Sequence, residues 1–172
     1  MATRTIVLPV ASRFNKCRVL VFSGVTLNST LHAVAATWQQ HQHQLEFLRD
    51  KVNVMEMRTP RSTEFDVKDP QSQHILITDG EQPVACGRIT TTGVISRICV
   101  LPGYRGQGVG ALVLKNLVKL ARGNDLETIT LSAKLETLEF YTRFGFEPQG
   151  QVFMKAGIPR RHASCHINQV RF

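Results

Sequence analysis

Four glycines fall between a strand-like segment that ends at Leu101 and a helix-like segment that begins near Leu112. Glycines let the backbone approach a ligand closely and point successive N–H groups at one place. A helix that begins directly after such a turn adds N–H donors and the positive end of its dipole, and Arg105 adds a guanidinium suited to phosphate. The turn therefore predicts a cradle for a pyrophosphate. Its glycines are Gly103, Gly106, Gly108 and Gly110.

Two common nucleotide-binding motifs fit this turn poorly. A P-loop needs Lys followed by Ser or Thr after its last glycine, whereas Val109-Gly110 stands there. A dinucleotide fingerprint reads G-x-G-x-x-G and belongs to an early βαβ unit, whereas residues 106–110 read G-x-G-x-G. A glycine-rich connector that holds no ligand is the remaining alternative.

The order of the elements predicts one α+β domain. A chain of 172 residues is the size of a single domain. Helical spacing over 31–54, with Ser29 or Thr30 as its cap, predicts one long helix or two short ones, and a polar loop follows over 58–73. An antiparallel meander and then a strand–helix–strand–helix–strand series come next. Their expected ranges are strands 74–78, 84–89 and 94–101, helix 112–121, strand 128–133, helix 135–144, and strands at 146 and 152–154.

A second motif, combined with the glycine turn, carries a family resemblance. Residues 105–110 (RGQGVG) match the R/Q-x-x-G-x-G/A signature of the GNAT superfamily of acetyl-CoA-dependent N-acetyltransferases. Residues 140–146 (FYTRFGF) resemble the F-Y-x-x-x-G-F of the same superfamily. The resemblance implies a single GNAT-like domain over 1–172, with a mixed, mostly antiparallel central sheet, a splayed strand pair and flanking helices. Residues 45–167 match best, while 1–28 form an N-terminal strand or extension of uncertain role.

Within that superfamily the chain is most similar to the ElaA-like branch. The shared residues are Leu48, Arg49, Val52, Val54, Glu56, Glu64, Asp66, Asp69, His74, Phe153, Ala156, Gly157, Ile158 and Pro159. Two positions depart from the pattern. Lys134 stands where the family often has Asn, or Gln in this branch, and Arg160 stands where the branch has a His.

The resemblance implies acetyl-CoA as co-substrate and no metal. The strand before the turn would bond the pantetheine arm and thioester, the amides of the turn would bond the pyrophosphate, and Lys134 would reach a phosphate or the adenylate group. The implied cofactor-binding residues are Ile98, Cys99, Val100, Arg105, Gly106, Gln107, Gly108, Val109, Gly110, Ala111 and Lys134.

It also implies direct transfer of the acetyl group to an amine, with Tyr141 as general acid toward the CoA thiolate. The alternative for Tyr141 is a core aromatic, because Leu138 and Phe144 flank it at helical spacing. Candidates for the base or the acceptor side bracket the polar loop, and their alternative roles are loop capping and surface charge. These candidates are Glu56, Asp66, Asp69 and His74.

The cysteines and histidines suggest no further chemistry. None of the four cysteines forms a Cys-x-x-Cys pair, so we expect reduced thiols in a cytoplasmic protein. Cys99 lies in the cofactor strand, but no His near it in sequence would activate an acyl-cysteine. The histidine spacings do not predict a metal site. The cysteines are Cys17, Cys86, Cys99 and Cys165.

The net charge of +8 favours anionic partners. A basic helix face formed by Lys115, Lys119 and Arg122 would suit a nucleic-acid-binding module, but aromatic residues make up only 7% and do not interleave with basic ones. No apolar run approaches the roughly 20 residues that span a bilayer, so no membrane partner is expected. The meander leaves a homodimer open.

The sequence therefore predicts an N-acetyltransferase that moves the acetyl group of acetyl-CoA to a primary amine of an unidentified acceptor. The alternatives are a CoA-binding sensor of the same fold without turnover, because fold does not determine function, and the basic nucleic-acid-binding module.

Overall fold

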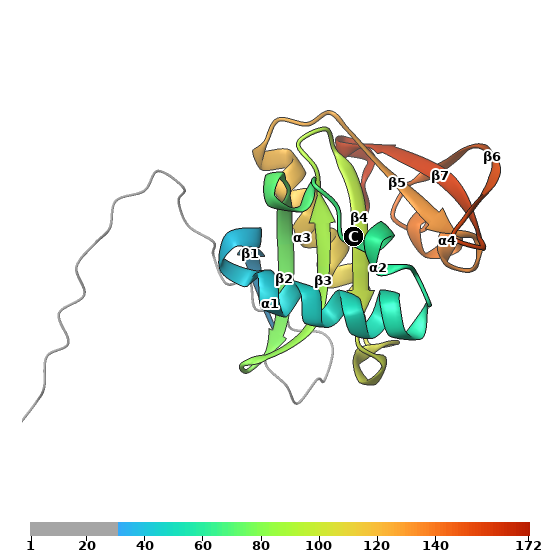
Figure 1. Ribbon diagram of the computed structural model, residues 1–172. Coiled ribbons are helices and arrows are strands. Elements are labelled where there is room, and N and C mark those ends of the chain that lie inside the picture. The colour runs from blue at the N-terminus through green and yellow to red at the C-terminus, as the bar shows by residue number, and fades with distance from the viewer. Residues whose placement is uncertain (1–30) are drawn as a thin grey trace, which may run out of the picture.

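The computed structural model describes residues 31–172, which form a seven-stranded mixed sheet with helices on both faces (Figure 1). The strand order is β1-β2-β3-β4-β5-β7-β6. The strands are β1 Leu31–Ala36, β2 Gln73–Asp79, β3 Gln82–Ile89, β4 Val94–Val100, β5 Thr128–Lys134, β6 Glu147–Lys155 and β7 Ile158–His166. The helices are α1 Trp38–Arg49, α2 Arg61–Glu64, α3 Val109–Gly123 and α4 Leu135–Thr142, with the π-helix η1 Asp50–Glu56 and the 3-10 helices η2 Asp69–Gln71, η3 Pro102–Tyr104 and η4 Ile167–Gln169.

The predicted meander is confirmed. Strands β2, β3 and β4 pair antiparallel in sequence order, and the Asp79-Gly80 turn joins the first two. Gly80 has φ +57°, the left-handed conformation that a tight hairpin favours in glycine. The expected N-terminal extension over 1–28 and Cys17 lie outside the described residues.

The prediction that a helix begins near Leu31 is wrong over the first residues of that range. Residues Leu31–Ala36 form β1, which pairs antiparallel along the edge of β2 from Leu31 opposite Asp79 to Ala36 opposite His74. The helix begins instead at Trp38 and continues through η1 to Glu56. Pairing with the exposed edge of β2 satisfies strand hydrogen bonds and overrides the helical spacing of a short apolar stretch.

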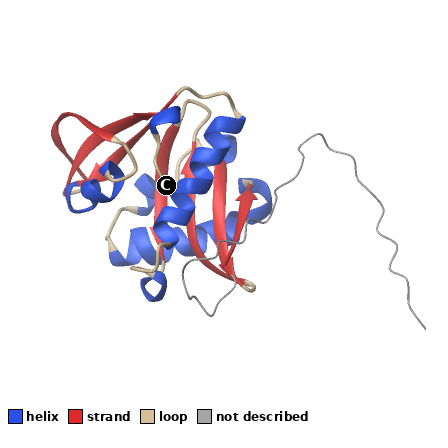
Figure 2. Ribbon diagram, turned by 180° about the vertical axis from the view of Figure 1, so that it is seen from behind, coloured by secondary structure: helices blue, strands red, loops and turns tan. Residues whose placement is uncertain are grey.

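The helices form two layers, one on each face of the sheet. Helix α1, η1 and α2 cover the face seen in Figure 1, and α3 packs on the opposite face, seen in Figure 2. Close packing of α3 depends on Gly87 of β3, because a Cβ there would lie 2.6 Å from Cγ1 of Val113. Buried apolar residues fill both layers, with Leu114 and Leu117 on the α3 side and Leu45 and Leu48 on the α1 side.

The C-terminal third extends the sheet beyond β4. The predicted strand, helix and strand appear as β5, α4 and β6. The following segment, which alternates like a strand around His162 and His166, forms β7 and inserts between β5 and β6. The predicted loop over 58–73 contains α2 and η2. Within the described part of the chain, no helix combines the length and apolar character needed to cross a bilayer.

Candidate active site

Strands β4 and β5 form a fork, which matches the splayed strand pair that the family resemblance implied. They pair in parallel only where Val94 lies opposite Thr130 and Ile95 opposite Leu131. Beyond this point β4 stays paired with β3 as far as Val100, so its other edge faces the opening of the fork. Arg97, at a bulge just beyond the last pair, has φ +57°, which is uncommon for a residue other than glycine. The fork thus offers strand backbone groups to an extended ligand.

The glycine turn closes the end of β4 and leads directly into α3. Gly106 and Gly108 have φ +73° and +78°, and a Cβ added to Gly103, Gly106 or Gly108 would meet no heavy atom within 4 Å. The turn backbone therefore borders open space. Helix α3 has no acidic residue in its first turn to compete for its N-terminal donors. Positive φ, open space and a helix N-terminus fit an anionic group such as a pyrophosphate.

Arg105 lies at this turn but is held by a carboxylate. Its Nη1 and Nη2 donate to the two carboxylate oxygens of Glu56, both at 2.7 Å, and its Nε donates to the Val100 carbonyl at 3.0 Å. The hydrogen bond from Arg105 holds the pKa of Glu56 below its usual value. The structure thus brings two predicted site residues together as an ion pair between η1 and the glycine turn.

Tyr141 lies on α4, on the β5 side of the fork. Its ring packs edge-on against Phe140 and Phe146, with centroids 5.0 and 6.0 Å apart. Burial raises the pKa of Tyr141 to about 12, while the charge of Arg160 acts in the opposite direction. The hydroxyl makes no hydrogen bond to residues 31–172. The Tyr141 ring therefore packs in the core, as its alternative role predicted, while its hydroxyl has no partner among residues 31–172 and is available to a ligand.

Lys134, at the end of β5, lies near the Glu56–Arg105 pair, and its charge contributes to the lowered pKa of Glu56. Its Nζ lies 2.9 Å from Sδ of Met57 and 3.4 Å from Oε1 of Glu136. The amine therefore faces the segment that follows η1. This position is on the α1 side of the sheet.

A buried ion-pair network holds the polar segment 61–71 against the sheet. Arg49 of α1, only 1% exposed, donates from Nε to Glu64 at 2.9 Å and from Nη1 to Asp69 at 2.7 Å. Its guanidinium also lies over the Phe65 ring at 4.5 Å. Hydrogen bonds and charge from Arg49 hold the pKa of Asp69 below its usual value despite burial.

Two arginines of the meander complete this network. Arg88 of β3 bonds Asp66 at 2.6 Å and Asp69 at 2.7 Å through Nη1. Arg97 reaches Glu64 at 3.2 Å and Asp66 at 3.1 Å. Arg88 holds the pKa of Asp66 well below its usual range, which makes this carboxylate a weak base at neutral pH. Arg49, Arg88 and Arg97 come from three separate elements, and their spacing in the sequence does not predict that they lie together.

His74 lies beneath the same segment and not in the fork. It is 1% exposed, its Nε2 lies 3.0 Å from the Asp69 carbonyl oxygen, and its ring lies 5.8 Å from that of Trp38. Burial lowers the pKa of His74, which keeps the imidazole neutral at pH 7. The structure therefore groups His74 with Asp66 and Asp69, and it places Glu56 apart at the turn.

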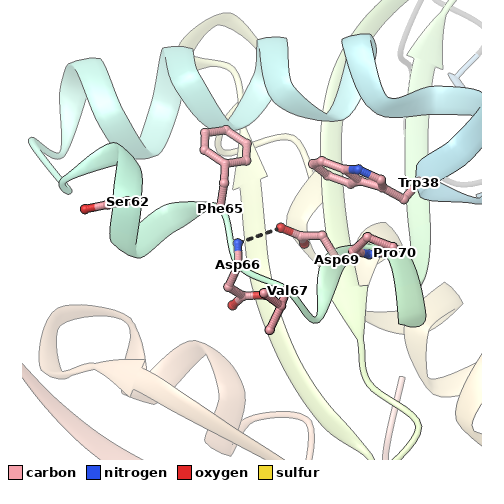
Figure 3. Close-up of a pocket in the computed structure, with 7 residues that line it drawn as sticks. All are labelled: Trp38, Ser62, Phe65, Asp66, Val67, Asp69 and Pro70. Carbon is pink, nitrogen blue, oxygen red and sulfur yellow. Dashed lines mark hydrogen bonds between the residues drawn. The ribbon is translucent and has the colours of Figure 1, made fainter.

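An open hollow of about 570 Å³ lies over this network (Figure 3). In Figure 3 the Trp38 and Phe65 rings form its apolar wall, and the Asp66 amide donates to Asp69 Oδ2 at 3.2 Å. Neither the glycine turn nor Tyr141 contributes to it. Its lining residues are Trp38, Ser62, Phe65, Asp66, Val67, Asp69 and Pro70.

Cys99 is a packed thiol. Its Sγ lies 3.3 Å from that of Cys86 on β3, and both residues are buried. The hydrogen bond to Cys86 and burial raise the pKa of Cys99 well above its usual value, so its thiolate is scarce at neutral pH. Cys86, Cys99 and Cys165 are free thiols, as predicted. No metal-binding group of three or more His, Cys, Asp or Glu side chains occurs over 31–172.

Comparison with known proteins identifies the family. A family model described as an acetyltransferase (GNAT) domain matches residues 35–163. The uncharacterized N-acetyltransferase YjcF of Bacillus subtilis (strain 168) is 33% identical over 133 residues, which cover 75% of this chain and 95% of YjcF. The uncharacterized protein YyaT of the same organism is 31% identical over 129 residues, 72% of this chain and 87% of YyaT.

Solved structures share the fold. The crystal structure of Escherichia coli ElaA superposes with a TM-score of 0.72 at 24% identity, covering 80% of this chain and 100% of ElaA. An acyl-CoA N-acyltransferase from Pseudomonas aeruginosa also gives a TM-score of 0.72, at 23% identity, over 79% of this chain and 99% of that protein. At these identities the likeness shows the fold alone. On the family model and the YjcF relationship, this chain belongs to the GNAT family of acetyltransferases.

Proposed function

We propose that the protein is an N-acetyltransferase that transfers the acetyl group of acetyl-CoA directly to a primary amine. One observation carries this proposal: the β4–β5 fork ends at an open turn in which Gly106 and Gly108 have positive φ and from which α3 begins. This arrangement supports binding of an extended chain with a pyrophosphate at one end. The family membership supports the acyl-transfer chemistry.

Backbone groups would hold the co-substrate. The free edge of β4 over 98–100 would bind the pantetheine arm, and the amides over 105–111 would bind the pyrophosphate. Arg105 contributes through its backbone and through a guanidinium that Glu56 fixes beside the turn. Lys134, whose amine contacts Met57 next to Glu56, would reach a phosphate or the adenylate group from this side.

Acetyl-CoA supplies a thioester whose carbonyl carbon receives the nitrogen lone pair, while the C–S bond breaks and CoA leaves. A backbone N–H near Val100 would stabilise the developing negative charge on oxygen. Tyr141 would donate its proton to the leaving sulfur, since a raised pKa keeps its hydroxyl protonated. The nitrogen loses one proton to solvent and the Tyr141 oxygen regains one from solvent, so the products are an N-acetylated amine and the CoA thiol.

We propose no protein base at the thioester. Asp66 and Asp69 are held by arginines and His74 is buried, so we give all three a structural role. A lysine-like amine costs roughly 4 kcal/mol to deprotonate at neutral pH. Positioning of two reactants contributes about 7–11 kcal/mol in favourable cases. Orientation at the fork is therefore sufficient to offset the deprotonation cost.

Calorimetric titration with acetyl-CoA tests the binding part of the proposal. The informative variant is Gly108→Asp, which puts a carboxylate and strained backbone into the turn, and the matched control is Gly103→Asp, at a position with open space and no positive φ. We expect micromolar binding by the wild type and a loss of at least about 10-fold in Gly108→Asp, well beyond that in the control.

Absence of binding by the wild type would contradict the proposal. Binding without any transfer to amines would instead favour a CoA sensor of the same fold.

A further inference from the structure

Buried polar atoms without partners gather at the fork. Within residues 31–172, four buried side-chain nitrogen or oxygen atoms make no hydrogen bond, and three of them are Arg97 Nε, Ser132 Oγ and Arg160 Nε. Native structures leave few buried polar groups unsatisfied, and each one calls for an explanation. A ligand group that accepts hydrogen bonds would satisfy these donors.

The strand register places these residues together on one face. Arg160 of β7 lies opposite Lys134 of β5, and Ser132 precedes Lys134 by two residues, so all three share a face. The Arg160 Nη1 donates to the Ser132 carbonyl at 2.6 Å. Because Lys134 contacts Met57, this face is the α1 side of the sheet. Arg97 borders the same opening from β4.

The charges on this face do not balance. Arg49, Arg88 and Arg97 are matched by the carboxylates of Glu64, Asp66 and Asp69. Lys134 on the same face lies 3.4 Å from Glu136, and two further cations lie beyond these pairs.

Those cations are Arg160 and Lys155, and neither lies within 4.0 Å of a carboxylate in the described part of the chain. Burial and the charge of Arg97 lower the pKa of both groups. Bound negative charge would relieve that repulsion.

We propose that the acceptor amine also carries a carboxylate, an inference that rests on the proposed acetyl transfer. Arg160 binds this carboxylate at the fork, with Ser132 and Lys155 as further donors. A guanidinium matches a carboxylate in shape and offers two parallel N–H groups. The donor Nε of Arg160 has no partner among residues 31–172, so a carboxylate would complete its hydrogen bonds. The acceptor is thus an amino acid or a related amino carboxylate. Arg160 replaces the His of the ElaA-like branch, so this specificity would belong to this chain.

Matched acceptor pairs test the proposal in an assay of thiol release from acetyl-CoA. Glycine is compared with glycinamide, and β-alanine with β-alaninamide. We expect kcat/KM to favour each carboxylate by about 10-fold or more, mainly through KM. The amides have the less basic amines, so intrinsic reactivity at neutral pH opposes the expected preference.

Variants of adjacent arginines assign the effect to one side chain. Arg160→Gln should abolish the carboxylate preference, measured as the ratio of kcat/KM for each acid to that for its amide, while Arg160→Lys should restore part of it. The matched control is Arg161→Gln, the same charge change one residue along β7 on the opposite face, where Nε donates to the Gly150 carbonyl at 3.1 Å. Thermal unfolding of each variant confirms folding, and Lys155→Gln replaces Arg160→Gln if the latter unfolds.

The outcomes separate this inference from the proposed function. Acetyl transfer that favours the amides, or that ignores Arg160→Gln, would overturn the inference and leave the transferase intact. A lack of acetyl-CoA binding would overturn the transferase itself. A preference for succinyl-CoA over acetyl-CoA that depends on Arg160, without discrimination among acceptors, would place the carboxylate on the acyl group and overturn its assignment to the acceptor.

Discussion

At the scale of single residues, Tyr141 carries the clearest prediction. Tyr141→Phe should lower kcat by about 10²–10⁴-fold, with acetyl-CoA affinity changed little, because the hydroxyl makes no hydrogen bond to residues 31–172. With its pKa raised to about 12, the hydroxyl stays protonated below that pH. The rate should therefore rise with pH from 7 to 10 as the amine deprotonates. An unchanged kcat in Tyr141→Phe would leave Tyr141 as a core aromatic only.

Glu56 provides a second prediction. Its carboxylate is held by Arg105, which makes it a weaker base. Glu56→Gln should leave the shape of the pH–rate profile unchanged and lower kcat less than about threefold. The KM for acetyl-CoA should fall slightly, since a negative charge leaves the phosphate site. The control is Glu136→Gln, another exposed carboxylate. A drop of about 10²-fold in kcat, with loss of a pH-dependent limb, would identify Glu56 as the base after all.

At the scale of elements, the packing of α3 on β3 depends on Gly87. An added methyl group would lie 2.6 Å from Val113 and 2.9 Å from Leu117, so Gly87→Ala should lower the free energy of unfolding by about 1–3 kcal/mol. Gly123→Ala, in open space at the end of α3, should be neutral or stabilising by up to about 1 kcal/mol. Denaturant unfolding measures both, and equal stability of the two variants would contradict the close packing.

Most helices and strands could be predicted from the sequence because the residues that start or end them are neighbours in the chain. The Asp79-Gly80 turn, the glycine turn before α3 and the helix ending at Gly123 depend on neighbouring residues alone. The edge strand β1 was mistaken for helix because its partner β2 begins far along the chain. The residues of β7 around His162 and His166 alternate like a strand, but its place between β5 and β6 depends on pairing that the local sequence does not contain.

The candidate site, too, could be predicted only where it depends on residues that are close in sequence. Its cofactor side follows from one contiguous segment, residues 97–111. The network of Arg49, Arg88 and Arg97 required long-range pairing, so the sequence named the carboxylates Asp66 and Asp69 without their partners. The placement of Arg160 at the fork likewise depends on the register of β7 against β5.

At the scale of the whole molecule, the buried network should make stability depend on acid. The pKa values of Asp66 and Asp69 are lowered on folding, so their contribution is complete above about pH 5 and is lost progressively as pH falls below the unfolded value near 4 toward the lowered native values. His74, whose pKa is also lowered, adds a loss below about pH 6.5. Unfolding temperature should therefore fall steadily from pH 7 to pH 3.

Removing one carboxylate tests this assignment. Asp69→Asn leaves Arg49 and Arg88 short of a partner, so it should lower the free energy of unfolding at pH 7 by about 3–5 kcal/mol. It should also flatten the acid dependence. Glu81→Gln, an exposed change in the β2–β3 turn, should do neither. A variant Asp69→Asn as stable as the wild type would show that the network is not coupled to folding.

The most direct test of the account is the product of the reaction. The protein is incubated with acetyl-CoA and an amino carboxylate such as β-alanine, free thiol is followed with time, and the acceptor is analysed by mass spectrometry. We expect thiol release in step with one acetyl group gained on the acceptor nitrogen. Both should be lost in Gly108→Asp and reduced in Tyr141→Phe. Acetyl-CoA bound without product, with every amine supplied in turn, would contradict it.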